Sequence, residues 1–234
     1  MTDKTIRAEG YKEGQVILID KPLEWTSFQA VNKVRWLIKK HFGIKKIKVG
    51  HAGTLDPLAT GLLIICTGKF TKKIDTFQAQ EKEYTGTFTL GATTPSYDLE
   101  TKIDQTFNIS GITSEKIKEA TKQFLGQIQQ QPPVFSALKK DGKRLYEFAR
   151  NGEIVDIPYR TIQISEFEIT DINLPKVDFR VVCSKGTYIR SLAHDFGKSL
   201  NCGAHLSALR RTKIGDFSVE NAVGIKEFEV AVTS

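Results

Sequence analysis

Residues 50–61 read GHAGTLDPLATG and run directly into the apolar stretch LLIIC at residues 62–66. Pro57 fixes its own φ and biases Asp56 away from the helical region. Glycine allows positive φ and close backbone approach, and three glycines frame the stretch: Gly50, Gly53 and Gly61. The pattern predicts a stiff loop that presents one carboxylate, followed by a buried strand.

Asp56 has two interpretations when only the residues are considered. A carboxylate on a rigid loop beside a core strand is typical of a catalytic or ligand-binding acid. An Asp-Pro pair in a Gly-rich loop is also typical of a turn, in which the Asp side chain accepts nearby backbone N–H groups. His51 supplies an imidazole in the same loop. The residues alone leave both interpretations open.

Basic residues concentrate in two parts of a chain whose formal net charge is +7. Residues 31–50 contain seven Lys or Arg and no acid, and residues 180–213 contain seven against Asp195 alone. Such blocks indicate a polyanion-binding face, and solvated surfaces are the alternative. We expect the helix over 28–40 and the pair Arg210-Arg211 to belong to this face.

The sequence also excludes several classes of protein and site. The first residues lack the apolar segment of a signal peptide, and no apolar run approaches the roughly 18 residues of a membrane span. The three cysteines form no C-x-x-C pair, and the four histidines lack metal-ligand spacing. No glycine motif for a nucleotide phosphate is present. We therefore expect a cytoplasmic protein without a metal or a cofactor.

The periodicity of the chain predicts an α+β fold. Residues 15–20, 84–90, 157–169 and 177–183 resemble strands, and helices are expected after Thr26, Ser114 and Thr187. Thr26 and Gln29 have the spacing of a capping box. The apolar face expected for the helix that follows consists of Phe28, Val31, Val34, Leu37 and Ile38. Strands and helices do not alternate strictly, which favours α+β over a parallel doubly wound sheet.

Three further stretches carry chemical groups. CSKGTYIR, residues 183–190, places Tyr188 and Arg190 at a helix start that Thr187 is positioned to cap. KEYTGTF places Tyr84 in a strand. QPPVFSALKKDGKRLYEFARNG, residues 131–152, interleaves basic and aromatic side chains, a composition that suits RNA. Each stretch has an ordinary alternative: a solvated Arg, a core Tyr, and a helical hairpin whose Tyr146 and Phe148 pack inward.

The GHAGTLDPLATG, KEYTGTF and SKGTYIR stretches together resemble the TruB family of tRNA pseudouridine synthases, whose relatives include the dyskerin-type enzymes. The resemblance runs from about Val16 to Val223. It implies the pseudouridine synthase fold, in which a mixed, largely antiparallel central sheet has flanking helices and an inserted RNA-binding thumb. Residues 131–152 are similar to that thumb.

The resemblance also implies roles for individual residues. Asp56 corresponds to the catalytic acid and Arg190 to the arginine that pairs with it. Tyr84 corresponds to a tyrosine that stacks on the target base, and His51 to a histidine that contacts the RNA. Tyr188 and Leu209 correspond to pocket residues, and Lys21 to a lysine that supports the catalytic loop. A surface position is the alternative for Lys21, and a core position is the alternative for Leu209.

The chain departs from the family pattern in two places. Thr94-Pro95-Ser96 stands where the family usually has Thr-Asp-Thr, although Asp98 is retained. Many relatives continue into a small C-terminal PUA domain, whereas this sequence ends at Ser234. We therefore expect residues 1–234 to form a single catalytic domain without a PUA domain.

The resemblance implies an isomerase that converts the T-loop uridine of tRNA, position 55, into pseudouridine by base flipping. We expect it to act on the T arm as a monomer, with no protein partner and no membrane. Two alternatives remain: a non-catalytic RNA-binding protein on the same scaffold, and a dyskerin-type subunit that depends on guide RNA and protein partners.

Overall fold

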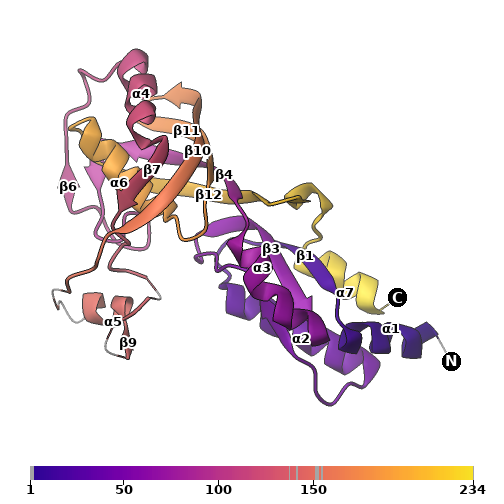
Figure 1. Ribbon diagram of the computed structural model, residues 1–234. Coiled ribbons are helices and arrows are strands. Elements are labelled where there is room, and N and C mark those ends of the chain that lie inside the picture. Colours follow the sequence, from indigo (N-terminus) through magenta and orange to yellow (C-terminus); the bar gives the residue numbers. More distant parts are fainter. Residues whose placement is uncertain (1–2, 137, 141, 151–152, 154, 234) are drawn as a thin grey trace. The chain divides into compact units, whose positions relative to one another are not determined.

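The computed structural model describes residues 3–136, 138–140, 142–150, 153 and 155–233 (Figure 1). The chain forms two compact units, of which unit 1 is Met1–Tyr84 with Arg210–Ser234 and unit 2 is Thr85–Leu209. Strands β4 (Lys82–Leu90) and β12 (Ala204–Ile214) contribute residues to both units. The expected α+β content is confirmed. The single-domain organisation expected for residues 1–234 stays a prediction.

Unit 1 contains the strand order β1-β3-β12, with β2 paired to β3 and β13 paired to β12. The β1–β3, β2–β3 and β12–β13 pairs are antiparallel. Its elements besides β4 and β12 are α1 (Asp3–Glu13), β1 (Val16–Lys21), α2 (Ser27–Phe42), β2 (Val49–His51), β3 (Ala59–Thr67), η1 (Gly68–Lys73), α3 (Ile74–Ala79), β13 (Phe217–Ser218), η3 (Val219–Asn221) and α7 (Ile225–Thr233).

Strand β3 is buried on both of its faces. Leu63 and Ile65 pack in one cluster with residues of α1, α2 and α7, which lie together beside β1 and β3 (Figure 1). Leu62 and Ile64 pack in a second cluster, with residues of η1, α3 and β13 at its edge. Successive strand residues face opposite sides, so a strand covered on both sides must be apolar throughout. The predicted buried strand at 62–66 is confirmed.

Helix α2 begins as its sequence predicts. The Thr26 side chain accepts the Gln29 backbone N–H, and the Gln29 side chain accepts the Thr26 N–H, so the predicted capping box is confirmed. The placement of Phe28 on the apolar face is wrong, because its side chain is 67% exposed. Ser27 takes the inward position instead, and each helical residue turns about 100° further around the axis, which carries position 28 off the buried stripe.

Unit 2 contains the strand order β12-β4-β11-β10-β7, and its β7–β10 and β10–β11 pairs are antiparallel. Its elements besides β4 and β12 are β5 (Ala92–Thr93), β6 (Gln105–Thr106), α4 (Ser114–Ala120), η2 (Thr121–Phe124), β7 (Gly126–Gln130), β8 (Lys139–Lys140), β9 (Lys143–Arg144), α5 (Leu145–Arg150), β10 (Arg160–Asn173), β11 (Lys176–Cys183) and α6 (Ile189–Ser199). The strands expected at 157–169 and 177–183 are confirmed, although β10 begins three residues later and ends four residues later than expected.

Aromatic rings fill the core of unit 2. Phe88 stacks on Phe179 with ring centroids 4.1 Å apart, and Phe167, Phe196 and Phe124 surround that pair. Phe196 lies on α6, Phe124 on η2 and the other three on neighbouring strands, so one cluster of rings holds both helices against the sheet. Phe196 lies in the C-terminal half of α6, so the cluster anchors that half of the helix to the sheet.

Among the described residues of the 131–152 segment, β8 and β9 pair in an antiparallel manner and α5 follows. Leu145 is buried, and the Lys143 ammonium lies 5.9 Å from the centroid of the half-buried Phe148 ring. Several side chains that are predicted to bind RNA are not among the side chains that the structure describes: those of Lys139, Lys140, Arg144, Tyr146 and Arg150. Residues 137, 141, 151 and 152 lie entirely outside the described residues. The role of this segment stays a prediction.

No helix in the described part of the chain is both long enough and apolar enough to cross a membrane. The expected cytoplasmic location stays a prediction.

Candidate active site

The stretch that contains Asp56 leaves β2 after His51 and enters β3 at Ala59. Gly53 and Gly61 have φ of +94° and +100°, as expected for glycines that shape a loop. Gly50 is different: it lies in β2 without positive φ, and a Cβ there would meet the Ile74 side chain at 2.7 Å. The Ala59 N–H donates to the Asp56 carbonyl at 3.0 Å and closes the turn, while the Asp56 side chain is half-buried.

The residues on either side of Asp56 are both held by the segment that leads into α2. The buried Ser27 hydroxyl donates to the Leu55 carbonyl at 3.1 Å and accepts the Leu55 N–H at 2.8 Å. The Glu24 N–H donates to the Pro57 carbonyl at 2.8 Å, and Glu24 has a φ of +65°. Contacts immediately before and after a residue restrict its backbone, so the position of Asp56 is set from both sides.

Lys21 is fully buried at the end of β1, so a surface position for it is wrong. Its ammonium donates to the carbonyls of Trp25 and Pro22 at 2.6 and 2.9 Å and lies 3.5 Å from that of Pro57. Burial lowers the pKa of Lys21 to about 8, although the nearby Asp56 carboxylate opposes this shift. Lys21 thus contacts the backbone that supports Asp56.

Arg211 is a second buried cation beneath the same loop, with 1% of its surface exposed. Its Nε donates to the Leu62 carbonyl at 2.8 Å, and one terminal nitrogen donates to the Gly53 carbonyl at 3.1 Å. A Cβ at Gly61 would lie 2.3 Å from the Arg211 carbonyl, so β3 and β12 approach closely at this glycine. Arg211 therefore links β12 to both ends of the Asp56 loop.

His51 pairs with Ile65 across the β2–β3 ladder and is half-buried. Burial lowers its pKa, the Arg211 guanidinium lowers it further, and a backbone contact to Gly53 opposes both effects. The neutral imidazole is the favoured form at neutral pH.

Tyr84 is the last residue of unit 1 and is buried on the inward face of β4, in the alternation that its sequence predicts.

Arg190 lies in unit 2 at the start of α6 and is 4% exposed. One terminal nitrogen donates to the carbonyls of Phe135 and Ser96 at 2.8 and 3.3 Å, and Nε lies 3.7 Å from the Asp98 carboxylate. Arg190 therefore contacts both the retained acid and the base of the 131–152 segment. Pro95 stands where the family usually has an acid, and its side chain is exposed.

Tyr188 is held by Gln130, which is 2% exposed at the end of β7. The Gln130 amide nitrogen donates to the Tyr188 carbonyl at 3.1 Å, and its oxygen accepts the Tyr188 N–H at 2.8 Å. Tyr188 is also the N-cap of α6, without a side-chain bond to the helix. The prediction that Thr187 caps this helix is wrong, because its hydroxyl donates back to the Ser184 carbonyl.

The predicted site residues thus lie in both units. Lys21, His51, Asp56 and Tyr84 belong to unit 1, while Tyr188, Arg190 and the partly exposed Leu209 belong to unit 2. Within unit 1, Lys21 and Arg211 hold the loop of Asp56. The pairing of Arg190 with Asp56, and the pocket expected from Tyr84, Tyr188 and Leu209, stay predictions.

Arg210 and Arg211 do not form one RNA-binding surface, so that expectation is wrong. Arg210 makes two bonds to the Asp20 carboxylate, at 3.0 and 2.7 Å, and Arg211 is buried. Adjacent residues of a strand face opposite sides, and this rule could have separated the two arginines in the sequence. Ser27 and Gln130 carry no comparable signal, since neighbouring residues do not reveal partners that lie far along the chain.

The described residues contain no group of three or more His, Cys, Asp or Glu side chains that could hold a metal ion. The three cysteines are buried and free, and burial raises the pKa of Cys66 to about 11. The absence of a cofactor stays a prediction.

Comparison with known proteins supplies the family. Residues 39–189 match the model of the TruB family pseudouridylate synthase N-terminal domain, and residues 190–234 match that of the tRNA pseudouridylate synthase B C-terminal domain. The chain is 68% identical to tRNA pseudouridine synthase B of Flavobacterium johnsoniae, over 94% of this chain and 97% of the relative. It is 57% identical to that of Phocaeicola vulgatus, over 93% of each chain.

Two solved structures support the same assignment. A Cbf5-Nop10-Gar1 complex contains a chain that is 30% identical, with a TM-score of 0.70 over 98% of this chain and 56% of that one. An H/ACA RNP bound to a substrate RNA with 2′-deoxyuridine contains a chain that is 29% identical, with a TM-score of 0.67 over 94% and 53%. The present chain thus spans about half the length of the matched chain in each structure. On its motifs, its fold and these similarities, the chain belongs to the TruB family of pseudouridylate synthases, which are isomerases.

Proposed function

We propose that this chain converts uridine 55 in the T loop of tRNA into pseudouridine, with Asp56 as its catalytic residue. The observation that carries the proposal is the support of the Asp56 loop. Ser27 and Glu24 bond the residues before and after Asp56, and two buried cations bond the loop backbone. Because these contacts fix the backbone around Asp56, its carboxylate is suited to a reaction that needs a catalytic group in a fixed position.

The reaction is an isomerisation and conserves atoms. The bond from C1′ to uracil N1 breaks, the base turns, and a bond from C1′ to C5 forms. C5 then loses its proton and N1 gains one. Three roles are chemically open to the Asp56 carboxylate: attack at C1′, attack at C6, and removal of a ribose proton. All three require the ionised carboxylate.

The remaining residues would hold the RNA and the detached base. A flipped base loses its stacked neighbours, and the ring of Tyr84 can replace one of them. Tyr188 and Leu209 would line the pocket, Arg190 would pair with Asp56, and His51 would contact the RNA as a neutral imidazole. Lys21 acts on the loop rather than on the substrate, because its ammonium is buried against backbone carbonyls.

We further propose that the chain acts on the T arm of tRNA as a cytoplasmic monomer, without guide RNA, protein partner or cofactor. The names of its relatives support a tRNA substrate, since the chain is 68% identical to a tRNA pseudouridine synthase B. Its 30% identity to a chain of a Cbf5-Nop10-Gar1 complex is much lower, which favours a lone enzyme over a subunit of an assembly.

The test is mass-spectrometric mapping of unmodified tRNA transcript after incubation with the purified chain, in the presence of a metal chelator and without any other protein. We expect one pseudouridine per tRNA, at position 55. A matched transcript with cytidine 55 should gain none. Unmodified tRNA would favour the non-catalytic or guide-dependent alternative, and pseudouridine at another position would overturn the assigned substrate site.

A further inference from the structure

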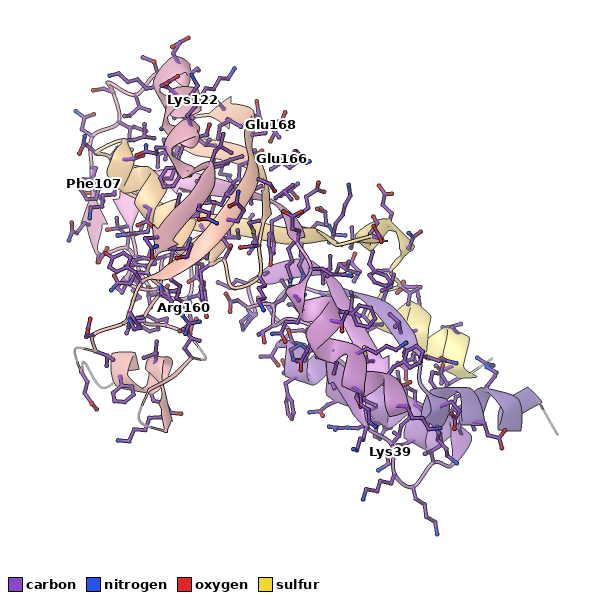
Figure 2. All side chains as sticks on the ribbon, in the orientation of Figure 1. Lys39, Phe107, Lys122, Arg160, Glu166 and Glu168 are labelled. Atoms are coloured by element: carbon purple, nitrogen blue, oxygen red, sulfur yellow. The ribbon has the colours of Figure 1, made fainter. Side chains whose placement is uncertain are left out.

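A groove of about 620 Å³ lies along the C-terminal half of α2 in unit 1. Every charged side chain that lines it is cationic, and Lys39 is one of them (Figure 2). The complete lining consists of Asn32, Arg35, Trp36, Lys39, Lys40, Gly43, Ile44 and Lys45. A groove with this charge favours a polyanionic occupant.

Trp36 is the aromatic residue of this groove and is 47% exposed. The ammonium groups of Lys33 and Lys40 lie 4.9 and 4.6 Å from the centroid of its ring. Lys33 is itself paired with Glu229 at 3.0 Å, so one of these two cations is held in place. The two ammonium groups orient the indole, and about half of the Trp36 surface stays exposed to a ligand.

Helix stability explains only part of this arrangement. Lys39 and Lys40 lie in the last turn of α2, where cations interact favourably with the negative end of the helix dipole. That effect fades beyond the last turn, yet the exposed Lys45, Lys46 and Lys48 continue the positive charge past the cap at Gly43. The helix dipole also gives no reason for an exposed tryptophan, because exposing a large apolar surface to water is unfavourable.

The groove lies far from the reacting atoms. The first residue of α2, Ser27, bonds the residue next to Asp56, and Trp36 and Lys40 follow it along the same continuous helix. At 1.5 Å per helical residue, these side chains start roughly 14 to 20 Å from that contact. A ligand in the groove therefore contributes to binding and not to the chemical step.

We propose that this groove binds the tRNA substrate at a second place, with backbone phosphates on Lys39, Lys40 and Lys45 and a base or ribose face on Trp36. The proposal rests on the proposed function, which supplies the RNA. RNA fits better than an acidic protein, because the groove combines several cations with an exposed aromatic face, the pairing that recognises phosphate and unstacked bases.

The test measures the Kd of full-length tRNA as a function of salt, together with single-turnover kinetics at saturating tRNA. Lys39→Ala/Lys40→Ala should weaken binding roughly tenfold and make the slope of log K against log salt shallower by about 0.9 per lost phosphate contact. Trp36→Ala should weaken binding roughly five- to tenfold, with an unchanged slope. The saturating rate should stay within about twofold of wild type for both variants.

Conservative variants separate the proposed contacts from general effects. Trp36→Phe and Lys39→Arg/Lys40→Arg should restore most of the affinity, because they keep the ring and the charges. The control Lys102→Ala/Lys118→Ala removes two exposed cations of unit 2 and should change the Kd by less than about twofold. Wild-type affinity in the groove variants, or an equal loss in the control, would overturn the proposal. The Kd is independent of turnover, so failure of the groove and failure of the proposed function give different results.

Discussion

Arg211 and Arg190 are both buried arginines that donate to backbone carbonyls, but their surroundings differ. Arg211 bonds the carbonyls of Gly53 and Leu62 and has no carboxylate within ion-pair distance among the described residues. Arg190 bonds the carbonyls of Phe135 and Ser96 and also faces Asp98 at 3.7 Å. No neighbouring carboxylate among the described residues thus neutralises the positive charge of Arg211 beside the Asp56 loop, whereas Asp98 partly neutralises that of Arg190.

This difference indicates two uses of the same side chain. Burial lowers the pKa of both His51 and Lys21 most, and the charge of Arg211 lowers both further, so Arg211 acts on its surroundings as well as on the backbone. Arg190 also contributes geometry, since its planar fork joins the 94–98 turn to the start of the 131–152 segment. Substitutions that separate charge from shape can therefore test each use.

Both arginines are assumed to serve Asp56, so the largest effect should come from Asp56 itself. Asp56→Asn should lower the rate of pseudouridine formation at least a thousandfold, because the amide cannot act as a base or nucleophile. The Kd for tRNA should change by less than about threefold, since one neutralised acid hardly alters the cationic surface. Single-turnover kinetics and a binding titration measure the two quantities. A tenth of the wild-type rate would contradict the assignment.

The second effect tests the geometric use of Arg190. Arg190→Lys should lower the rate about a hundredfold, because one ammonium cannot replace the fork that contacts Phe135, Ser96 and Asp98. Arg180→Lys is the matched control on β11, where the arginine forms an exposed ion pair with Glu166 at 2.7 Å, and it should keep the wild-type rate. Wild-type kinetics in Arg190→Lys would show that charge alone suffices at this position.

The third effect tests the charge of Arg211. Arg211→Lys keeps the charge and should lower the rate about tenfold, whereas Arg211→Met removes it and should lower the rate about a hundredfold. Arg210→Lys is the adjacent control and should cost less than about threefold, because its partner Asp20 is half-exposed. Equal losses in the Lys and Met variants, measured at equal folded fraction, would mean that Arg211 acts by shape, as Arg190 does.

A smaller effect is expected where a neutral side chain holds the loop. Ser27→Ala removes two buried hydrogen bonds to Leu55 and should lower the free energy of unfolding by about 1 to 3 kcal/mol and the rate several-fold. Thr26→Ala removes the helix cap one residue earlier and should cost about 1 kcal/mol with little change in rate. Denaturant titration and kinetics of both variants distinguish loop positioning from helix stability.

The smallest effect concerns the pH dependence of stability. Burial lowers the pKa of Lys21 to about 8 from its usual 10.5, so between these pH values the unfolded chain binds a proton that the folded chain has released. The free energy of unfolding therefore gains a contribution that increases with pH across this window. Lys21→Met lacks it, so the Tm of wild type minus that of the variant should grow from pH 8 to pH 10.5. A constant or shrinking difference would contradict the shift.

Local sequence signals predicted several features that the structure confirms. Thr26 and Gln29 lie three residues apart, so the capping box depends on one helical turn. Five consecutive apolar residues at 62–66 predicted a strand that is buried on both faces. Period-2 alternation from Tyr84 predicted the inward face of β4. In each case the cause and the consequence lie within a few residues of each other.

Errors occurred where burial depends on distant partners. The apolar pattern predicts an inward Phe28, but the inward position at the start of α2 belongs to Ser27, whose partner Leu55 lies 28 residues away. The charge of Arg211 predicts an outward side chain, but Arg211 is buried, and its partners Leu62 and Gly53 lie 149 and 158 residues away in the chain. Hydrophobicity alone could not predict either placement.

The sequence by itself determined the family and the local elements around Asp56, because motif, capping and periodicity act over short distances. Only the tertiary structure decided which cations are buried. A buried Lys or Arg is stable where carbonyls are already arranged to accept its protons, and at Lys21 and Arg211 those carbonyls come together only when the chain folds. The same residue types remain exposed on α2, where no such set of acceptors covers Lys39 and Lys40 among the described residues.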